Sequence, residues 1–87
     1  MIALTIYSKP GCHLCDDMKT VVTRVLRDML TVASVAEVDI STDPALEERY
    51  GPEIPVLMVN EKKVAKYRVT EEELRRVLRA AAISPEL

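Results

Sequence analysis

Two cysteines separated by two residues, Cys12 and Cys15, lie where a strand-like segment gives way to a long helical one. Residues 1–7 form a short apolar run typical of a buried strand, and a proline–glycine turn follows at residues 8–11. From residues 12 to 30 the apolar side chains recur at helical spacing. We therefore expect a fold that begins strand–turn–helix, with both sulfur atoms at the N-terminus of the helix.

The middle of the chain predicts a second strand and a short second helix. Residues 32–40 are rich in Val and Ala, a composition that favours a strand. Asp43 is a good N-cap residue, and Pro44 suits the first helical position. The second helix is predicted to end near residue 50, where Gly51 can stop it.

The last third of the chain predicts a hairpin followed by a helix. Two apolar runs, residues 55–60 and 64–69, are separated by a short turn. They must be antiparallel neighbours, because a parallel crossover needs a dozen or more residues. Thr70 and Glu73 form a capping box, and helical spacing continues to about residue 83.

The resulting order, β-α-β-α-β-β-α, predicts an α/β fold with a four-stranded mixed sheet and three helices. Alternation of strands and helices favours parallel pairing and a sheet covered by helices on both faces. With 87 residues there is room for one domain, spanning residues 1–87.

Composition argues against nucleic-acid and membrane partners. Twelve basic side chains stand against 14 acidic ones, and aromatic residues make up only 3% of the chain. A nucleic-acid site would need a basic surface or stacking aromatic rings, and no apolar run is long enough to cross a bilayer. The most basic stretch is interpreted as a solvated strand face; its residues are Lys62, Lys63, Lys66 and Arg68.

The spacing and position of the cysteines predict dithiol chemistry. A helix N-terminus carries unpaired N–H groups and about half a positive charge, which favour a thiolate over a thiol. Cys12, at the mouth of the turn, is expected to attack a disulfide, and the more sheltered Cys15 to resolve the mixed disulfide. Two cysteines are too few for a secreted disulfide scaffold, so we expect a reducing compartment, the cytoplasm.

Two other interpretations of the cysteine pair remain open at this point. The pair could be half of a zinc site, but two Cys and one His fall short of the four ligands that a structural zinc takes. The cysteines could also be inert packing groups. His13 either stabilises the Cys12 thiolate or is a spacer facing solvent, and Asp16 and Asp17 suit the first turn of a helix.

The stretch Tyr7-Ser8-Lys9-Pro10-Gly11-Cys12-His13-Leu14-Cys15, with Ile54-Pro55-Val56-Leu57 further along, resembles the glutaredoxins of the thioredoxin superfamily, in particular small bacterial glutaredoxin-like proteins. The resemblance implies a thioredoxin-like fold and a thiol–disulfide oxidoreductase. It implies protein or small-molecule disulfides as substrates, and glutathione as a co-substrate rather than a tightly bound cofactor. We expect a monomer without a metal.

The resemblance also assigns roles to three residues beside the cysteines. It implies a cis Ile54-Pro55 bond packed on the cysteine pair, whereas the base rate of about 5–6% cis favours a trans bond. The backbone of Ile54 would pair with the substrate as an added strand. Lys9 would meet a glutathione carboxylate; as an alternative it is an exposed turn lysine.

The chain also departs from the glutaredoxin pattern. His13 and Leu14 stand where glutaredoxins have Pro-Tyr, and residues 66–70 lack the Gly-Gly pair that precedes the last helix in that family. These departures keep a second hypothesis open: a non-catalytic binding or redox-sensing module on the same fold. A third is a glutathione-assisted iron–sulfur carrier, with one Cys per chain bound to a shared cluster.

Overall fold

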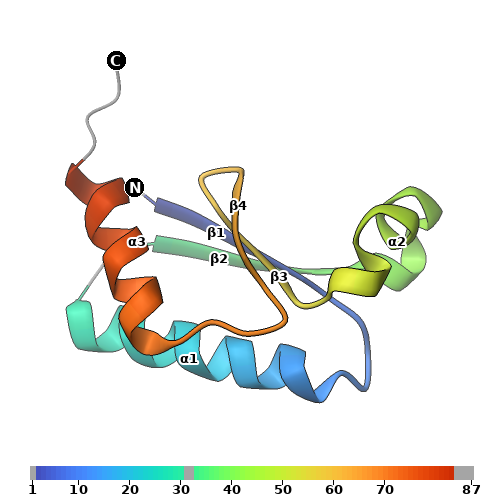
Figure 1. Ribbon diagram of the computed structural model, residues 1–87, viewed down its shortest axis with the longest axis horizontal. Coiled ribbons are helices and arrows are strands. Elements are labelled where there is room, and N and C mark those ends of the chain that lie inside the picture. The colour runs from blue at the N-terminus through green and yellow to red at the C-terminus, as the bar shows by residue number, and fades with distance from the viewer. Residues whose placement is uncertain (1, 31–32, 84–87) are drawn as a thin grey trace.

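The computed structural model describes residues 2–30 and 33–83. Its elements follow the predicted order (Figure 1). Their bounds are β1 Ile2–Ser8, α1 His13–Met29, β2 Ala33–Asp39, α2 Pro44–Tyr50, β3 Val56–Val59, β4 Lys62–Lys66 and α3 Glu71–Ile83. Two short 3₁₀ turns, Ile40–Thr42 and Gly51–Glu53, flank α2. The predicted strand ends at residues 1 and 32 lie outside the described residues.

The four strands form one mixed sheet in the order β2-β1-β3-β4. β1 and β2 are parallel, with Ser8 opposite Asp39 at their carboxyl ends. β3 is antiparallel to β4, as the short hairpin turn predicts, and it is also antiparallel to β1. Because β1 and β2 end at the same edge, the turn toward the cysteines and the segment before α2 leave the sheet side by side.

One face of the sheet packs against α1 and α3 and forms the main core. Figure 1 shows α1 running along this face, with α3 crossing beside it. The helical spacing seen in the sequence places one apolar stripe of each helix against alternate strand residues. The buried residues are Ile2, Leu4, Ile6, Met18, Val22, Val25, Leu57, Val59, Val69, Leu74 and Leu78.

A helix also covers the opposite face, but only at one end, so the expectation of helices over both faces is confirmed there and not along the rest of the sheet. There α2 packs with Tyr50 and Ile40 buried on Val56, and Tyr7 stacks on Tyr50 with ring centroids 4.5 Å apart. The reason is length: a helix of seven residues is about 10 Å long, whereas a strand of seven residues spans about 23 Å. β2, an edge strand, has four successive exposed residues, 34–37.

β4 differs from its predicted position. The sequence predicts residues 64–69, but the strand spans Lys62–Lys66. It ends because Tyr67 has a left-handed backbone with φ 69°, which turns the chain away from the sheet. Val69, which the apolar pattern assigned to the strand, instead lies in the β4–α3 connection. It is buried in the main core and pairs with no strand.

The helix caps follow the sequence closely. Asp43 accepts hydrogen bonds from the N–H groups of Ala45 and Leu46 at the start of α2. Thr70 and Glu73 form the predicted capping box at the start of α3. None of the helices within the described residues is long and apolar enough to cross a membrane.

Candidate functional site: a cysteine pair at the start of α1

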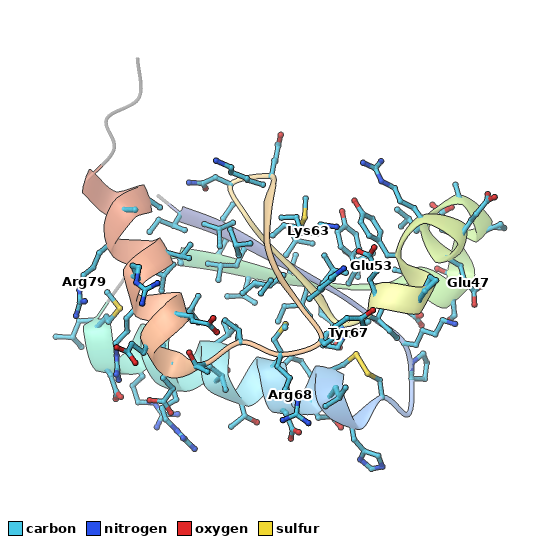
Figure 2. All side chains as sticks on the ribbon, viewed as in Figure 1. Glu47, Glu53, Lys63, Tyr67, Arg68 and Arg79 are labelled. Carbon is cyan, nitrogen blue, oxygen red and sulfur yellow. A yellow bond between two sulfur atoms is a disulfide. The ribbon has the colours of Figure 1, made fainter. Side chains whose placement is uncertain are left out.

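Cys12 and Cys15 form a disulfide at the N-terminus of α1, with their Cα atoms 5.2 Å apart. The turn that leads to them uses a left-handed φ of 78° at Gly11, a conformation that glycine adopts without strain. Cys12 is the N-cap residue, with an extended backbone, and Cys15 lies in the first turn of the helix. The predicted proximity of the two sulfur atoms is confirmed, and Figure 2 shows the yellow disulfide bond at this end of α1.

The two cysteines differ in exposure and in hydrogen bonding. Cys12 is half-buried, whereas Cys15 is 1% exposed. The backbone N–H of Cys15 donates to the Sγ atom of Cys12 over 3.1 Å. The Sγ atom of Cys12, the more accessible cysteine, therefore accepts a hydrogen bond, whereas Cys15 is buried.

Pro55 lies at the same end of the sheet as the cysteine turn. Val56, which follows it, pairs with Tyr7 near the carboxyl end of β1. The Ile54-Pro55 peptide bond is cis, as the family resemblance implies; the expectation from the base rate was wrong. Ile54 has an extended backbone, with φ −66° and ψ 148°, and Pro55 is buried.

Tyr67 is a site residue that sequence reasoning missed. Its backbone N–H donates to the carbonyl oxygen of Pro55 over 2.8 Å, and its hydroxyl donates to the carbonyl oxygen of Pro52 over 3.1 Å. The side chain thus spans the stretch that contains Ile54, and it is 43% exposed (Figure 2). An aromatic residue just past β4 gives no sequence signal for a left-handed φ, which is uncommon outside glycine.

A cavity of about 280 Å³ lies between α1 and the β4–α3 connection, next to the cysteine turn. Leu14, which stands between the two cysteines, lines one side, and Tyr67 lines the other. The remaining lining residues are Asp17, Met18, Val21, Arg68, Val69 and Thr70. This cavity links the cysteine pair to Tyr67 and has both apolar and charged walls.

Lys9, three positions before Cys12, has a carboxylate partner within the chain. Its Nζ atom lies 2.6 Å from Oε2 of Glu47 in α2. The alternative of a purely solvent-exposed turn lysine therefore does not describe it. Nothing in the sequence pairs these two residues, because they are distant along the chain and belong to different elements.

The other charged residues of the cysteine turn face solvent. His13, Asp16 and Asp17 are all exposed, and Asp16 lies 3.5 Å from the ammonium group of Lys19. Exposure of His13 agrees with the interpretation of this residue as a solvent-facing spacer. Asp16 lies in the first turn of α1, where a negative charge is favourable, and Asp17 follows it.

A small polar network beside the cysteine turn was also missed. The buried hydroxyl of Ser8 donates to Oε2 of Glu37 over 2.9 Å, and Lys19 pairs with the same carboxylate at 3.1 Å. The hydrogen bond to Glu37 raises the pKa of Lys19. Glu37 thus ties the end of β1 and the first turns of α1 to the edge strand β2.

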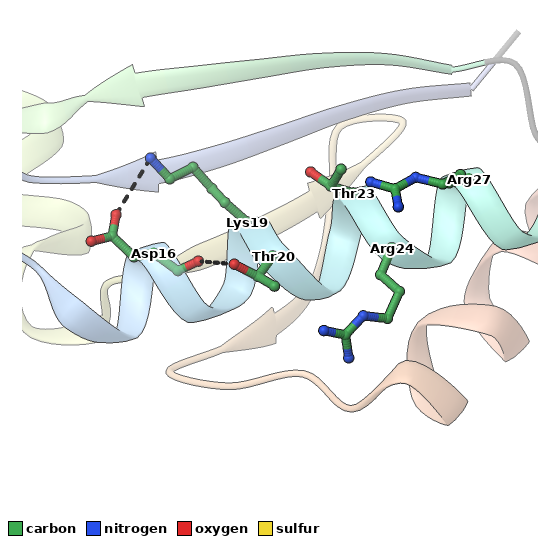
Figure 3. Close-up of a pocket in the computed structure, with 6 residues that line it drawn as sticks. All are labelled: Asp16, Lys19, Thr20, Thr23, Arg24 and Arg27. Atoms are coloured by element: carbon green, nitrogen blue, oxygen red, sulfur yellow. Dashed lines mark hydrogen bonds and ion pairs between the residues drawn. The ribbon is translucent and has the colours of Figure 1, made fainter.

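The outer side of α1 has a hollow of about 440 Å³ that contains neither cysteine (Figure 3). It is lined by residues of this one helix: Asp16, Lys19, Thr20, Thr23, Arg24 and Arg27. Arg24 pairs with Glu71 of α3 at 2.8 Å, and Thr20 donates to a backbone oxygen. The hollow is the solvent-facing surface of a helix, and we assign no chemistry to it.

Within the described residues, no three His, Cys, Asp or Glu side chains are grouped to hold a metal.

The arrangement resembles known structures. A structural-genomics target protein from X. campestris is 31% identical, with a TM-score of 0.67; the match covers 88% of this chain and 96% of that one. Protein Ne2328 from Nitrosomonas europaea is 22% identical, with a TM-score of 0.71 and coverages of 87% and 89%. A chloroplastic thioredoxin z is 11% identical, with a TM-score of 0.76 and coverages of 97% and 80%. The last two likenesses show a shared fold.

No curated protein matches the chain. A family model described as "Glutaredoxin-like domain (DUF836)" matches residues 3–79, which include the cysteine pair, Lys9, Ile54 and Pro55. The fold has the element order and the helix-start cysteines on which the resemblance to glutaredoxins rests. The chain therefore has the fold of thioredoxin z and belongs to the Glutaredoxin-like domain (DUF836) family.

Proposed function

We propose that this protein is a thiol–disulfide oxidoreductase that reduces disulfides or mixed disulfides. The observation that carries the proposal is the asymmetry of the cysteine pair: Cys12 is half-buried at the helix N-cap, and Cys15 is 1% exposed and bonded to it. A nucleophile must be reached by its substrate, whereas a resolving thiol must reach only the nucleophile. The pair meets both requirements.

The groups around Cys12 favour its thiolate once the disulfide is reduced. The N–H of Cys15 points at Sγ of Cys12, and the N-terminus of α1 supplies about half a positive charge. Hydrogen bonds to an ionised acceptor are about twice as strong as neutral ones. Cys12 is therefore the thiolate that attacks.

The reaction has two exchange steps. The Cys12 thiolate attacks one sulfur of the substrate disulfide, forms a mixed disulfide and expels the other sulfur as a thiolate, which takes up a proton. Cys15, losing its proton, then attacks Sγ of Cys12, which forms the Cys12–Cys15 disulfide and releases the second substrate thiol. Two electrons pass from the protein to the substrate, and a dithiol or two monothiols must return them.

The substrate is proposed to lie along the Ile54-Pro55 segment. Both residues are at the end of the sheet where the cysteine turn emerges, and Ile54 has the extended backbone that an added strand needs. Lys9 stands on the other side of Cys12 along the chain as a cation near the path of the substrate.

The proposed setting is the cytoplasm, where thiols are kept reduced. We propose a monomer that acts on protein or small-molecule disulfides, with glutathione as a co-substrate and no tightly bound cofactor. Nucleic acids and membranes are not among the proposed partners.

The test equilibrates the purified protein in a series of glutathione redox buffers, traps free thiols and weighs the products. We expect one cooperative step to the Cys12–Cys15 disulfide. Cys12→Ser should abolish disulfide reduction, and Cys15→Ser should accumulate a mixed disulfide on Cys12. Full activity in Cys12→Ser, or thiols that stay free under all conditions, would contradict the proposal.

A second candidate is a binding or redox-sensing module on the same fold. It is favoured by Tyr67, whose hydroxyl donates to the carbonyl oxygen of Pro52 and whose backbone N–H donates to that of Pro55. A module should keep a partner when both cysteines are changed to Ser. Loss of that partner in the double variant would count against this candidate.

A further inference from the structure

Lys9 pairs with one carboxylate, that of Glu47, and its charge also acts on a second, that of Asp39. Glu47, in the first turn of α2, lies 2.6 Å from its Nζ atom. Asp39, the last residue of β2, pairs in register with Ser8, the residue before Lys9. Hydrogen bonds from Ser41 lower the pKa of Asp39, and the charge of Lys9 adds to this lowering, so Asp39 is ionised within the field of Lys9.

This placement follows from the topology. The parallel strands β1 and β2 end at one edge, and α2 begins shortly after β2. The turn that carries Lys9 toward Cys12 therefore lies beside the acidic segment that leads into α2. The ammonium group of Lys9 is thus paired with Glu47 and close enough to Asp39 for their charges to interact, so these three side chains together carry a net negative charge.

A negatively charged substrate meets two obstacles at this place. Its carboxylate must displace Glu47 from Lys9, and it must also approach Asp39, which repels it. Neutral and cationic substrates meet neither obstacle. The ion pair is partly exposed, with side-chain exposures of 33% for Lys9 and 44% for Glu47, so the effect on rate is moderate and sensitive to salt.

We propose that Glu47 is a specificity-determining residue that neutralises Lys9, so that the cysteine pair reacts preferentially with disulfides bearing neutral or cationic groups. Disulfide substrates with a carboxylate near the reactive sulfur are disfavoured. This inference rests on the proposed function. It narrows the substrate class and assigns Glu47 a positioning role exerted through Lys9.

The test compares three small disulfides that share one skeleton and differ in charge. They are cystamine (cationic), bis(2-hydroxyethyl) disulfide (neutral) and 3,3′-dithiodipropionate (anionic). The reduced protein is mixed with each, and formation of the Cys12–Cys15 disulfide is followed by acid quench and mass spectrometry. Each rate constant is divided by that of dithiothreitol with the same disulfide, which removes intrinsic differences in reactivity.

For the wild-type protein, we expect the cationic and neutral disulfides to react faster than the anionic one. Glu47→Gln should raise the ratio of anionic to neutral rates by about threefold to tenfold, because one negative charge near the substrate is removed. Glu48→Gln is the matched control, since it removes the same charge from an exposed neighbouring residue of α2. That ratio should be unchanged in Glu48→Gln.

Salt provides a second measurement that a purely structural effect would not change. Raising the ionic strength from about 0.01 M to about 1 M shortens the Debye length from about 30 Å to about 3 Å, so the charge preference should fade. If the ratio of anionic to neutral rates is the same in wild type and Glu47→Gln, the inference is wrong while the proposed function stands. If no disulfide oxidises the cysteine pair, both are wrong.

Discussion

The backbone N–H of Cys15 donates to Sγ of Cys12 over 3.1 Å, so the proposed nucleophile is also the N-cap of α1. The same sulfur atom that would attack a substrate satisfies a donor at the start of the longest helix. The Cys12 side chain therefore serves both the proposed reaction and the stability of α1, and substitutions at Cys12 can separate these two roles.

Replacing Cys12 by Ser and by Ala should separate these two roles. Both variants should lose disulfide reduction, because neither has a nucleophilic sulfur. Serine is a good N-cap and alanine is a poor one, so Cys12→Ala should be less stable than Cys12→Ser by about 1 kcal/mol. Urea unfolding of both variants in the presence of a reductant measures the difference. Equal stabilities would show that the cap at this position contributes nothing.

Removing the hydroxyl of Tyr67 should favour extended substrates. This hydroxyl donates to Pro52, which holds the ring across the stretch containing Ile54. Loss of one hydrogen bond of about 1 kcal/mol corresponds to about a fivefold change in an equilibrium. Tyr67→Phe should therefore speed the reaction with a peptide disulfide by up to about fivefold and leave bis(2-hydroxyethyl) disulfide unaffected. An equal change in the rates with both substrates would show that the Tyr67 hydroxyl does not limit the access of extended substrates to Ile54.

Glycine substitutions at two left-handed positions should have different effects. Glu61 and Tyr67 both have φ 69°. For a residue with a Cβ atom this conformation costs about 1–2 kcal/mol, and glycine avoids that cost. Glycine also loses more conformational freedom on folding, which cancels about 0.5–1 kcal/mol of the gain. Glu61→Gly should raise the free energy of unfolding by up to about 1 kcal/mol. Tyr67→Gly should not, because it also loses the bond to Pro52. Chemical denaturation of both variants checks this.

The capping box of α3 should make stability depend on pH. Hydrogen bonds from the backbone and side chain of Thr70 lower the pKa of Glu73 below its ordinary value of 4.5. A carboxylate whose pKa is lower in the folded state stabilises the fold above pH 4.5, and this contribution is lost as the pH falls below that value. Glu73→Gln should flatten the acid side of the stability profile. Thr70→Ala should cost about 1 kcal/mol at neutral pH.

Truncation of Leu78 should test how much stability depends on the single well-covered face of the sheet. Leu78 of α3 is 0% exposed within the main core. Leu→Ala changes in cores cost about 2–5 kcal/mol, and a chain of 87 residues has little stability to lose. We expect Leu78→Ala to be largely unfolded at 37 °C, as judged by thermal unfolding. The exposed Arg79→Ala on the same helix is the control and should change little.

Local signals in the sequence predicted most of the fold. Asp43, Thr70 and Glu73 occur where helices start and bond residues two or three positions away, so their roles could be recognised from spacing. The cysteine pair could be placed for the same reason. Such features depend on neighbours in the chain, and the sequence displays those neighbours directly.

The features that sequence reasoning missed depend on contacts between distant segments. The pairing of Lys9 with Glu47, of Tyr67 with Pro52 and of Ser8 with Glu37 each joins elements separated by a turn or a helix. The boundary of β4 was wrong because Val69 looks like a strand residue but is buried in a connection. The spacing of apolar residues indicates which residues are buried, and burial alone does not distinguish a strand from a packed loop.

The exposed strand β2 has a consequence for the handling of this protein. Among the described strands it pairs only with β1, so its outer edge leaves backbone N–H and C=O groups open to solvent. Val35 on this strand is 48% exposed, and Glu37 and Asp39 place negative charges along it. Charged side chains on an exposed edge strand oppose edge-to-edge pairing with the strand of another chain. We therefore expect aggregation through this edge to increase when salt screens these charges.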